Sequence, residues 1–118
     1  MNAVTPVISI VSYLFAAFLG ALGQYLYKEG AAQVQLSNPL SLITNTRILL
    51  GVLCYVSVML LFVVGLKKGG QLTVLYPVYA TTFIWGALIG VFVLGESLTL
   101  FRILGTGLII TGVVFVVR

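Results

Sequence analysis

The chain has no histidine, one cysteine and two carboxylates, and each shortage removes a class of chemistry. Metal sites draw on clustered histidine, cysteine and carboxylate side chains, and hydrolytic sites need a positioned base of the same kinds. Glu29 and Glu96 lie far apart in the sequence, and Cys54 has no second cysteine with which to form a disulfide. We therefore expect no metal, no cofactor and no enzymatic activity.

Charge is the second shortage. Charged residues make up 7% of the 118 residues and hydrophobic residues 61%, and the mean hydropathy is +1.23. The hydrophobic residues form four stretches, at residues 7–26, 48–66, 72–94 and 98–117. Each has about the 20 residues that an α-helix needs to cross a bilayer core. The sequence predicts an all-α integral membrane protein, a single domain over residues 1–118 with four transmembrane helices.

The first stretch does not have the features of a cleaved signal peptide. Residues 1–6 contain no Lys or Arg, and the stretch is longer than the apolar region of such a peptide. We expect it to be the first helix of the mature protein.

Basic side chains divide equally between the two sides that four spans define. Three lie on the side of the termini and three on the other side: Lys67, Lys68 and Arg118 against Lys28, Arg47 and Arg102. The positive-inside rule gives a tie, which the terminal amine tips towards a cytoplasmic N-terminus. A chain with this balance is able to insert in both orientations unless a partner or the lipids fix one. The net charge of +4 suits anionic headgroups and does not indicate a nucleic-acid partner.

The connection between residues 27 and 47 is the longest loop. It contains a turn at Ser37-Asn38-Pro39 and two candidate caps for the second helix, Asn45 and Thr46. Its several apolar residues predict that it lies along the membrane interface. Two shorter connections contain glycines that predict tight turns and helix ends: residues 67–70 and 95–97.

Gln24 and Lys28 are polar residues near the end of the first span. A glutamine in lipid hydrogen-bonds across helices, typically for about 0.6 kcal/mol. Gln24 therefore either joins two helices or contacts a ligand near one mouth of a pathway. Lys28 can extend its ammonium to the interface and meet phosphates there.

Tyr76, Pro77, Tyr79 and Trp85 form a second group, in the third span. Pro77 removes a backbone donor, which leaves a carbonyl near residue 73 free and predicts a kink. Tyrosine and tryptophan gather at membrane interfaces, and Tyr76, near the end of the span, fits that role. Trp85 lies near the middle and does not, so Tyr79 and Trp85 are candidates for lining a cavity.

Glu96 follows the third span and precedes Ser97, a candidate N-cap of the fourth helix. A carboxylate there favours a helix N-terminus, and Arg102 is its candidate partner. The alternative is a role in proton relay. Small residues in the third and fourth spans predict faces on which two helix backbones meet closely: Gly86, Gly90, Gly105, Gly107, Thr111 and Gly112.

Four of these motifs occur in the order that is typical of the drug/metabolite transporter superfamily. They are Gly23-Gln24 through Lys28, then Leu75-Tyr76-Pro77 through Phe83-Ile84-Trp85, then Leu94-Gly95-Glu96-Ser97, and last Gly105 through Gly112-Val113. The chain therefore resembles a small, four-helix, EamA-like member of this superfamily. The resemblance extends over residues 14–116 and implies a bundle similar to that of the small multidrug resistance proteins.

Two branches of the superfamily are similar to this chain. The small multidrug resistance family uses a first-helix glutamate as a shared proton and drug site, and the matching position here is Gly20. This departure argues against proton-coupled export of cations. The small subunits thought to flip undecaprenyl-phosphate-linked aminoarabinose resemble the chain more closely and also lack that glutamate. They match it at Gly23-Gln24, Lys28, Tyr76-Pro77, Phe83, Trp85 and Glu96.

The resemblance implies a transporter or flippase in the cytoplasmic (inner) membrane that moves a polyprenyl-phosphate-linked sugar or a similar amphipathic metabolite. A homodimer, or a heterodimer with a related small subunit, is the expected assembly among membrane lipids, because four helices barely enclose a pathway. Two alternatives stay open: export of small cationic or aromatic compounds, and a non-transporting assembly subunit. The predicted substrate-binding residues offer hydrogen bonds for a sugar and charges for a phosphate: Gln24, Lys28, Arg47, Tyr76, Tyr79, Trp85, Glu96 and Arg102.

Overall fold

The computed structural model describes residues 4–118, which form six α-helices. Their bounds are α1 Val7–Ala31, α2 Leu40–Ile43, α3 Thr46–Lys67, α4 Leu72–Tyr79, α5 Thr82–Phe92 and α6 Leu100–Val117. Four segments are long and apolar enough to cross a membrane: α1, α3, α4 together with α5, and α6. The prediction of an all-α, multi-pass membrane protein is confirmed.

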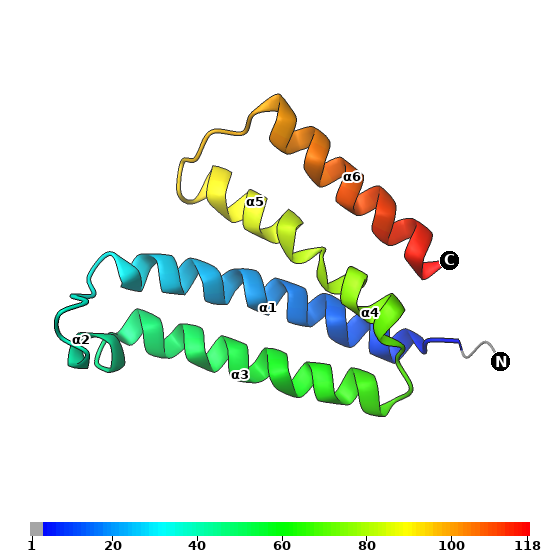
Figure 1. Cartoon of the computed structure of the whole chain (residues 1–118), viewed down its shortest axis with the longest axis horizontal. Helices are drawn as coiled ribbons and strands as arrows, with labels where there is room; N and C mark the ends of the chain where they lie inside the picture. Colours follow the sequence, from blue (N-terminus) through cyan, green and yellow to red (C-terminus); the bar gives the residue numbers. More distant parts are fainter. Residues whose placement is uncertain (1–3) are drawn as a thin grey trace.

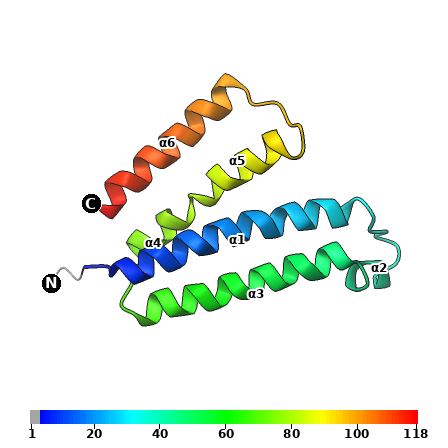
Figure 2. The same cartoon turned by 180° about the vertical axis from the view of Figure 1, so that it is seen from behind.

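The helices are arranged around α1. Figure 1 shows α3 running antiparallel to α1 on one side, with α4 and α5 on the other side and α6 outermost. The view from behind in Figure 2 gives the same order. The start of α1 and the end of α6 lie at one end of the bundle, as an even number of spans requires. α6 packs mainly against α4 and carries no buried residue.

Five helix ends differ from the predicted span ends, four of them by one or two residues. α1 continues to Ala31, five residues beyond the predicted 26, because a helix does not stop where the hydrocarbon ends. Lys28 and Glu29 therefore belong to its last turn. α6 begins at Leu100, and its N-cap is Thr99, whose hydroxyl accepts from the Arg102 N–H. The prediction that Ser97 caps this helix is wrong.

The cap of the second span and the glycine turns agree with the sequence. The Asn45 side chain accepts from the Ile48 N–H and caps α3. Gly69 and Gly95 have φ angles of 104° and 72°, which a residue with a Cβ rarely adopts.

The third span is interrupted between α4 and α5. Pro77 lies inside α4, and the chain leaves the helix three residues later, at Ala80 and Thr81. Around this point the N–H groups bond to carbonyls three residues back, as in Ala80 to Pro77 and Thr81 to Val78. The third span is therefore broken three residues after Pro77, whereas the missing proline N–H predicted a kink in the turn before it.

The core is small and lies where α1, α3, α4 and α6 meet. Tyr13, Leu75 and Val78 are buried there, and Phe62 and Val113 pack against them. The many exposed apolar side chains of α3 and α6 form the surface expected of a protein in lipid, where outward-facing leucine and valine carry no penalty.

Glycines opposite tyrosines set the close contacts between helices. In four places a Cβ on a glycine would strike a tyrosine of another helix: Gly20 with Tyr79, Gly23 with Tyr55, Gly51 with Tyr27 and Gly65 with Tyr13. The glycines singled out in the sequence do not act this way. Among residues 4–118, nothing outside the glycine's own stretch of helix lies within 4 Å of a Cβ placed on Gly86, Gly105, Gly107 or Gly112.

Candidate functional site

A groove lies between α1, α5 and the start of α6. Its larger part has a volume of about 380 Å³ and a second part has about 230 Å³. Both parts share Ala21, Gln24, Gly86 and Glu96, so we treat them as one feature, the lateral groove. Its walls are mainly apolar, and its polar lining comes from α1, α5, the α5–α6 connection and α6: Gln24, Lys28, Thr82, Glu96, Ser97, Arg102 and Thr106.

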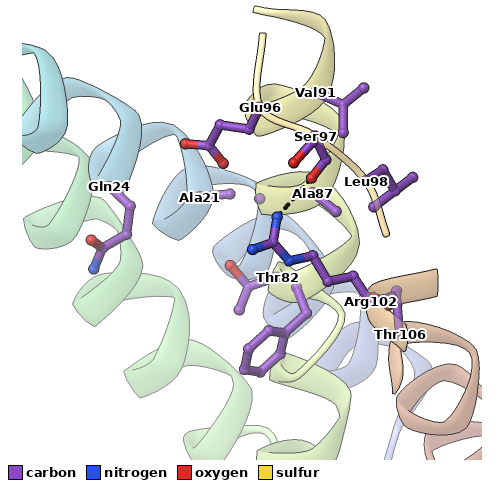
Figure 3. A pocket seen from close by; sticks show the side chains of 12 residues that line it. Ala21, Gln24, Thr82, Ala87, Val91, Glu96, Ser97, Leu98, Arg102 and Thr106 are labelled. Atoms are coloured by element: carbon purple, nitrogen blue, oxygen red, sulfur yellow. Dashed lines mark hydrogen bonds between the residues drawn. The ribbon is translucent and has the colours of Figure 1, made fainter. Parts of the chain in front are cut away.

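An ion pair lies at one end of the lateral groove. The Lys28 ammonium donates to the Glu96 carboxylate over 2.5 Å. Arg102 donates from Nη1 to the Ser97 carbonyl over 2.6 Å instead of pairing with Glu96. Figure 3 shows Arg102 reaching from α6 towards Ser97, with the Glu96 carboxylate pointing towards α1. The predicted Glu96–Arg102 pair is thus replaced by Lys28–Glu96, because the extended α1 brings Lys28 to the loop.

The α5–α6 connection places Glu96 over Gly90. The Glu96 N–H donates to the Gly90 carbonyl over 2.8 Å. A Cβ on Gly90 would lie 2.7 Å from Glu96 Oε1, so a larger residue at position 90 would push this carboxylate aside. Gly95, in the left-handed region, turns the chain back towards α5. The position of Glu96 is therefore set by the backbone on both sides of it.

Glu96 is ionised at neutral pH. The hydrogen bond from Lys28 and the charge of the same ammonium lower the pKa of the Glu96 carboxyl below its usual 4.5, and the charge of Arg102 contributes in the same direction. The end of the groove therefore holds two cations and one anion.

Gln24 joins two helices as well as lining the groove. Its Nε2 donates to the Tyr55 hydroxyl over 2.6 Å, and that hydroxyl donates to the Gly20 carbonyl over 3.3 Å. The Tyr55 ring also stacks on Tyr27, with centroids 5.3 Å apart. Sequence reasoning missed Tyr55, although a phenol in the middle of an apolar span is a polar group that needs a partner.

Tyr79 of α4 covers Gly20 of α1. A Cβ on Gly20 would fall on the Tyr79 hydroxyl, and the ring meets Phe62 edge-on at 5.0 Å. Tyr79 and the largely exposed Tyr76 line a separate pocket of about 200 Å³ beside Tyr13. This pocket is on the α4 side, away from Lys28 and Glu96.

Trp85 and Arg47 also lie outside the lateral groove. Trp85 is 39% exposed and meets Phe18 of α1 edge-on, with ring centroids 5.0 Å apart. Arg47 is exposed in the first turn of α3. Of the eight predicted site residues, the structure therefore brings four together: Gln24, Lys28, Glu96 and Arg102.

Comparison of the chain with protein-family models, with curated proteins and with solved structures gave no match. The fold and the groove are thus the observations from which a function is argued.

Proposed function

We propose that the protein is a transporter or flippase of the drug/metabolite transporter type. Its substrate is a polyprenyl-phosphate-linked sugar or a similar amphipathic metabolite, and it acts in the cytoplasmic membrane. The observation that carries the proposal is the lateral groove, whose apolar walls lead to a polar end with Gln24, Lys28, Glu96 and Arg102.

The shape of the groove matches the chemistry of such a substrate. A prenyl chain needs an apolar wall, whereas a sugar and a phosphate need hydrogen bonds and positive charge. Thr82, Ser97 and Thr106 supply hydroxyl groups along the groove. Lys28 and Arg102 outnumber Glu96 by one charge, so the end of the groove favours an anion. Gln24 and Thr82 lie within the spans, where a polar group without a partner is costly, and both line the groove.

A second subunit completes the pathway in this proposal. α6 carries no buried residue, and no other element of the described part of the chain lies within 4 Å of a Cβ placed on Gly105, Gly107 or Gly112. Small residues of this kind allow another helix to come close. The partner is a second copy of the chain or a related small subunit.

The test compares two arginines at the same end of the bundle. The purified protein is reconstituted into liposomes with a fluorescent polyprenyl phosphate, and flipping is followed by quenching from outside. Arg102→Gln should lower the flipping rate at least tenfold, because it removes a cation from the groove. Arg47→Gln, the same chemical change outside the groove, should keep the wild-type rate, and melting temperatures of both variants should match the wild type.

Other results separate the alternatives. Equal effects of Arg102→Gln and Arg47→Gln would refute the groove as the pathway. Transport of a cationic dye in place of the lipid phosphate would favour the small multidrug resistance type of exporter. No transport by the chain alone, restored by adding a related subunit, would make the protein an assembly subunit.

A further inference from the structure

The Lys28–Glu96 ion pair bridges parts of the chain that are 68 residues apart. It joins the last turn of α1 to the α5–α6 connection, at the polar end of the lateral groove. It is the one ion pair that residues 4–118 form. Its two side chains are 59% and 46% exposed, so solvent ions and substrates reach both of them.

The pair fastens to α1 the connection that leads into α6, a helix with few other contacts. α6 packs mainly on α4, and Val113, near its C-terminal end, is the α6 residue that reaches the core. At its N-terminal end, Thr99 and Arg102 bond within the same segment. Lys28–Glu96 therefore links the α5–α6 connection, which leads into α6, to the last turn of α1.

The Glu96 carboxylate lies beside two cations, Lys28 and Arg102, in a position that an external anion can also occupy. Glu96 and Arg102 line the same part of the groove, and Lys28 lines the adjoining part with Glu96. The phosphodiester that joins a polyprenyl chain to a sugar carries one negative charge and two non-bridging oxygens, as the Glu96 carboxylate does, so it matches the same two cations. Exposed ion pairs are weak, so such an exchange meets little resistance.

We propose that Glu96 occupies the phosphate-binding site of the empty protein, and that the phosphate of a lipid-linked substrate displaces it from Lys28. The displacement frees the α5–α6 connection from α1 and opens the lateral groove. This inference rests on the proposed function and adds two statements to it. The recognised group is a phosphate attached to an apolar chain. The gate opens when that phosphate replaces the Glu96 carboxylate at the Lys28 ammonium.

Binding to the detergent-solubilised protein tests the exchange without transport. The probes are farnesyl phosphate, farnesol and inorganic phosphate, measured by native mass spectrometry. Farnesyl phosphate should bind more tightly than either of the others. Glu96→Gln should tighten its binding about two- to fivefold, the range that an exposed ion pair allows. Glu29→Gln, the same charge change outside the groove, should leave binding unchanged.

A double variant distinguishes exchange from a general charge effect. If Glu96 competes for Lys28, the gain from Glu96→Gln should vanish in a Lys28→Gln background. A gain that persists without Lys28 would overturn the exchange, because Glu96 would then act only by repelling anions. Equal binding of inorganic and farnesyl phosphate would overturn the lipid-linked source, as would equal binding of farnesol.

The opening is measured with spin labels on both sides of the tie. Ala32→Cys and Leu100→Cys in a Cys54→Ser background place one label after α1 and one at the start of α6. Farnesyl phosphate should lengthen the distance between the labels, and Glu96→Gln should lengthen it without ligand. An unchanged distance in both cases would overturn the gate.

The outcomes separate this inference from the proposed function. Transport that survives in a protein with no anion exchange would reject the inference alone. Exchange and opening without any flipping in liposomes would reject the proposed function and leave the anion site in place.

Discussion

Replacing Gly20 by alanine should destabilise the protein through a clash with Tyr79, and Tyr79→Phe should restore most of the lost stability. A Cβ at this position would fall on the Tyr79 hydroxyl, while the next ring atom, Cζ, lies at 3.3 Å. Overpacking of this kind costs about 1–3 kcal/mol. Tyr79→Phe removes the clashing oxygen and leaves Cζ as the nearest atom, so Gly20→Ala should cost less than about 1 kcal/mol in that background.

These variants form a double-mutant cycle: the free energy of unfolding is measured in mixed detergent micelles for the wild type, Gly20→Ala, Tyr79→Phe and the double variant. Trp85 is the single tryptophan, and its contact with Phe18 joins α5 to α1, so its fluorescence reports loss of the bundle. We expect a coupling of about 1–2 kcal/mol between Gly20→Ala and Tyr79→Phe, within the range for residues in contact.

Gly86→Ala is the matched control. No atom of another described element lies within 4 Å of its Cβ position, and alanine is the better helix former by about 1 kcal/mol, so this variant should be neutral or stabilised. Additive effects of the two substitutions in the cycle, or a Gly20→Ala protein as stable as Gly86→Ala, would refute the view that glycine–tyrosine contacts hold α1 to its neighbours.

Three further predictions concern stability. Asn45→Ala should lower the unfolding free energy by about 1 kcal/mol in the same micelle assay, because it removes the side-chain cap of α3. Leu75→Ala should cost about 2 kcal/mol, the low end for a fully buried leucine, since lipid replaces water as the alternative environment; Leu108→Ala, 74% exposed, should cost nothing measurable. The pKa of Glu96 is lowered by Lys28, so its contribution to stability is present above its usual pKa of 4.5 and is lost as the pH falls through the folded-state value. The melting temperature should therefore be level between about pH 6 and 8 and fall in acid, and that acid-dependent fall should be smaller in Glu96→Gln.

The spans could be predicted because the membrane imposes them. A run of about 20 apolar residues has few other uses, and four such runs in this chain became four spanning segments. The Asn45 cap and the glycine turns could also be predicted, since they depend on neighbours within a few residues. The end of α1 could not, because hydropathy marks where hydrocarbon ends and not where backbone hydrogen bonding ends.

The candidate site was predictable in part. Gln24, Lys28, Glu96 and Arg102 were singled out as polar groups in or beside apolar spans, and they meet at one groove. Trp85 was singled out for the same reason, yet it packs on Phe18. A polar or aromatic residue in an apolar span indicates that its side chain makes a specific contact. Which neighbour it contacts depends on the rotation of one helix against another.

By itself, the sequence determined that this is a helical, multi-pass membrane protein with little charge and few catalytic groups, because composition and periodicity act locally along the chain. Only the tertiary structure decided which side chains from distant parts of the chain contact one another. Lys28 pairs with Glu96 across 68 residues, Tyr79 fills the space beside Gly20, and α6 stays largely unpacked. Such choices depend on helix packing, where the shapes of several side chains must agree at once, and no single stretch of sequence carries that information.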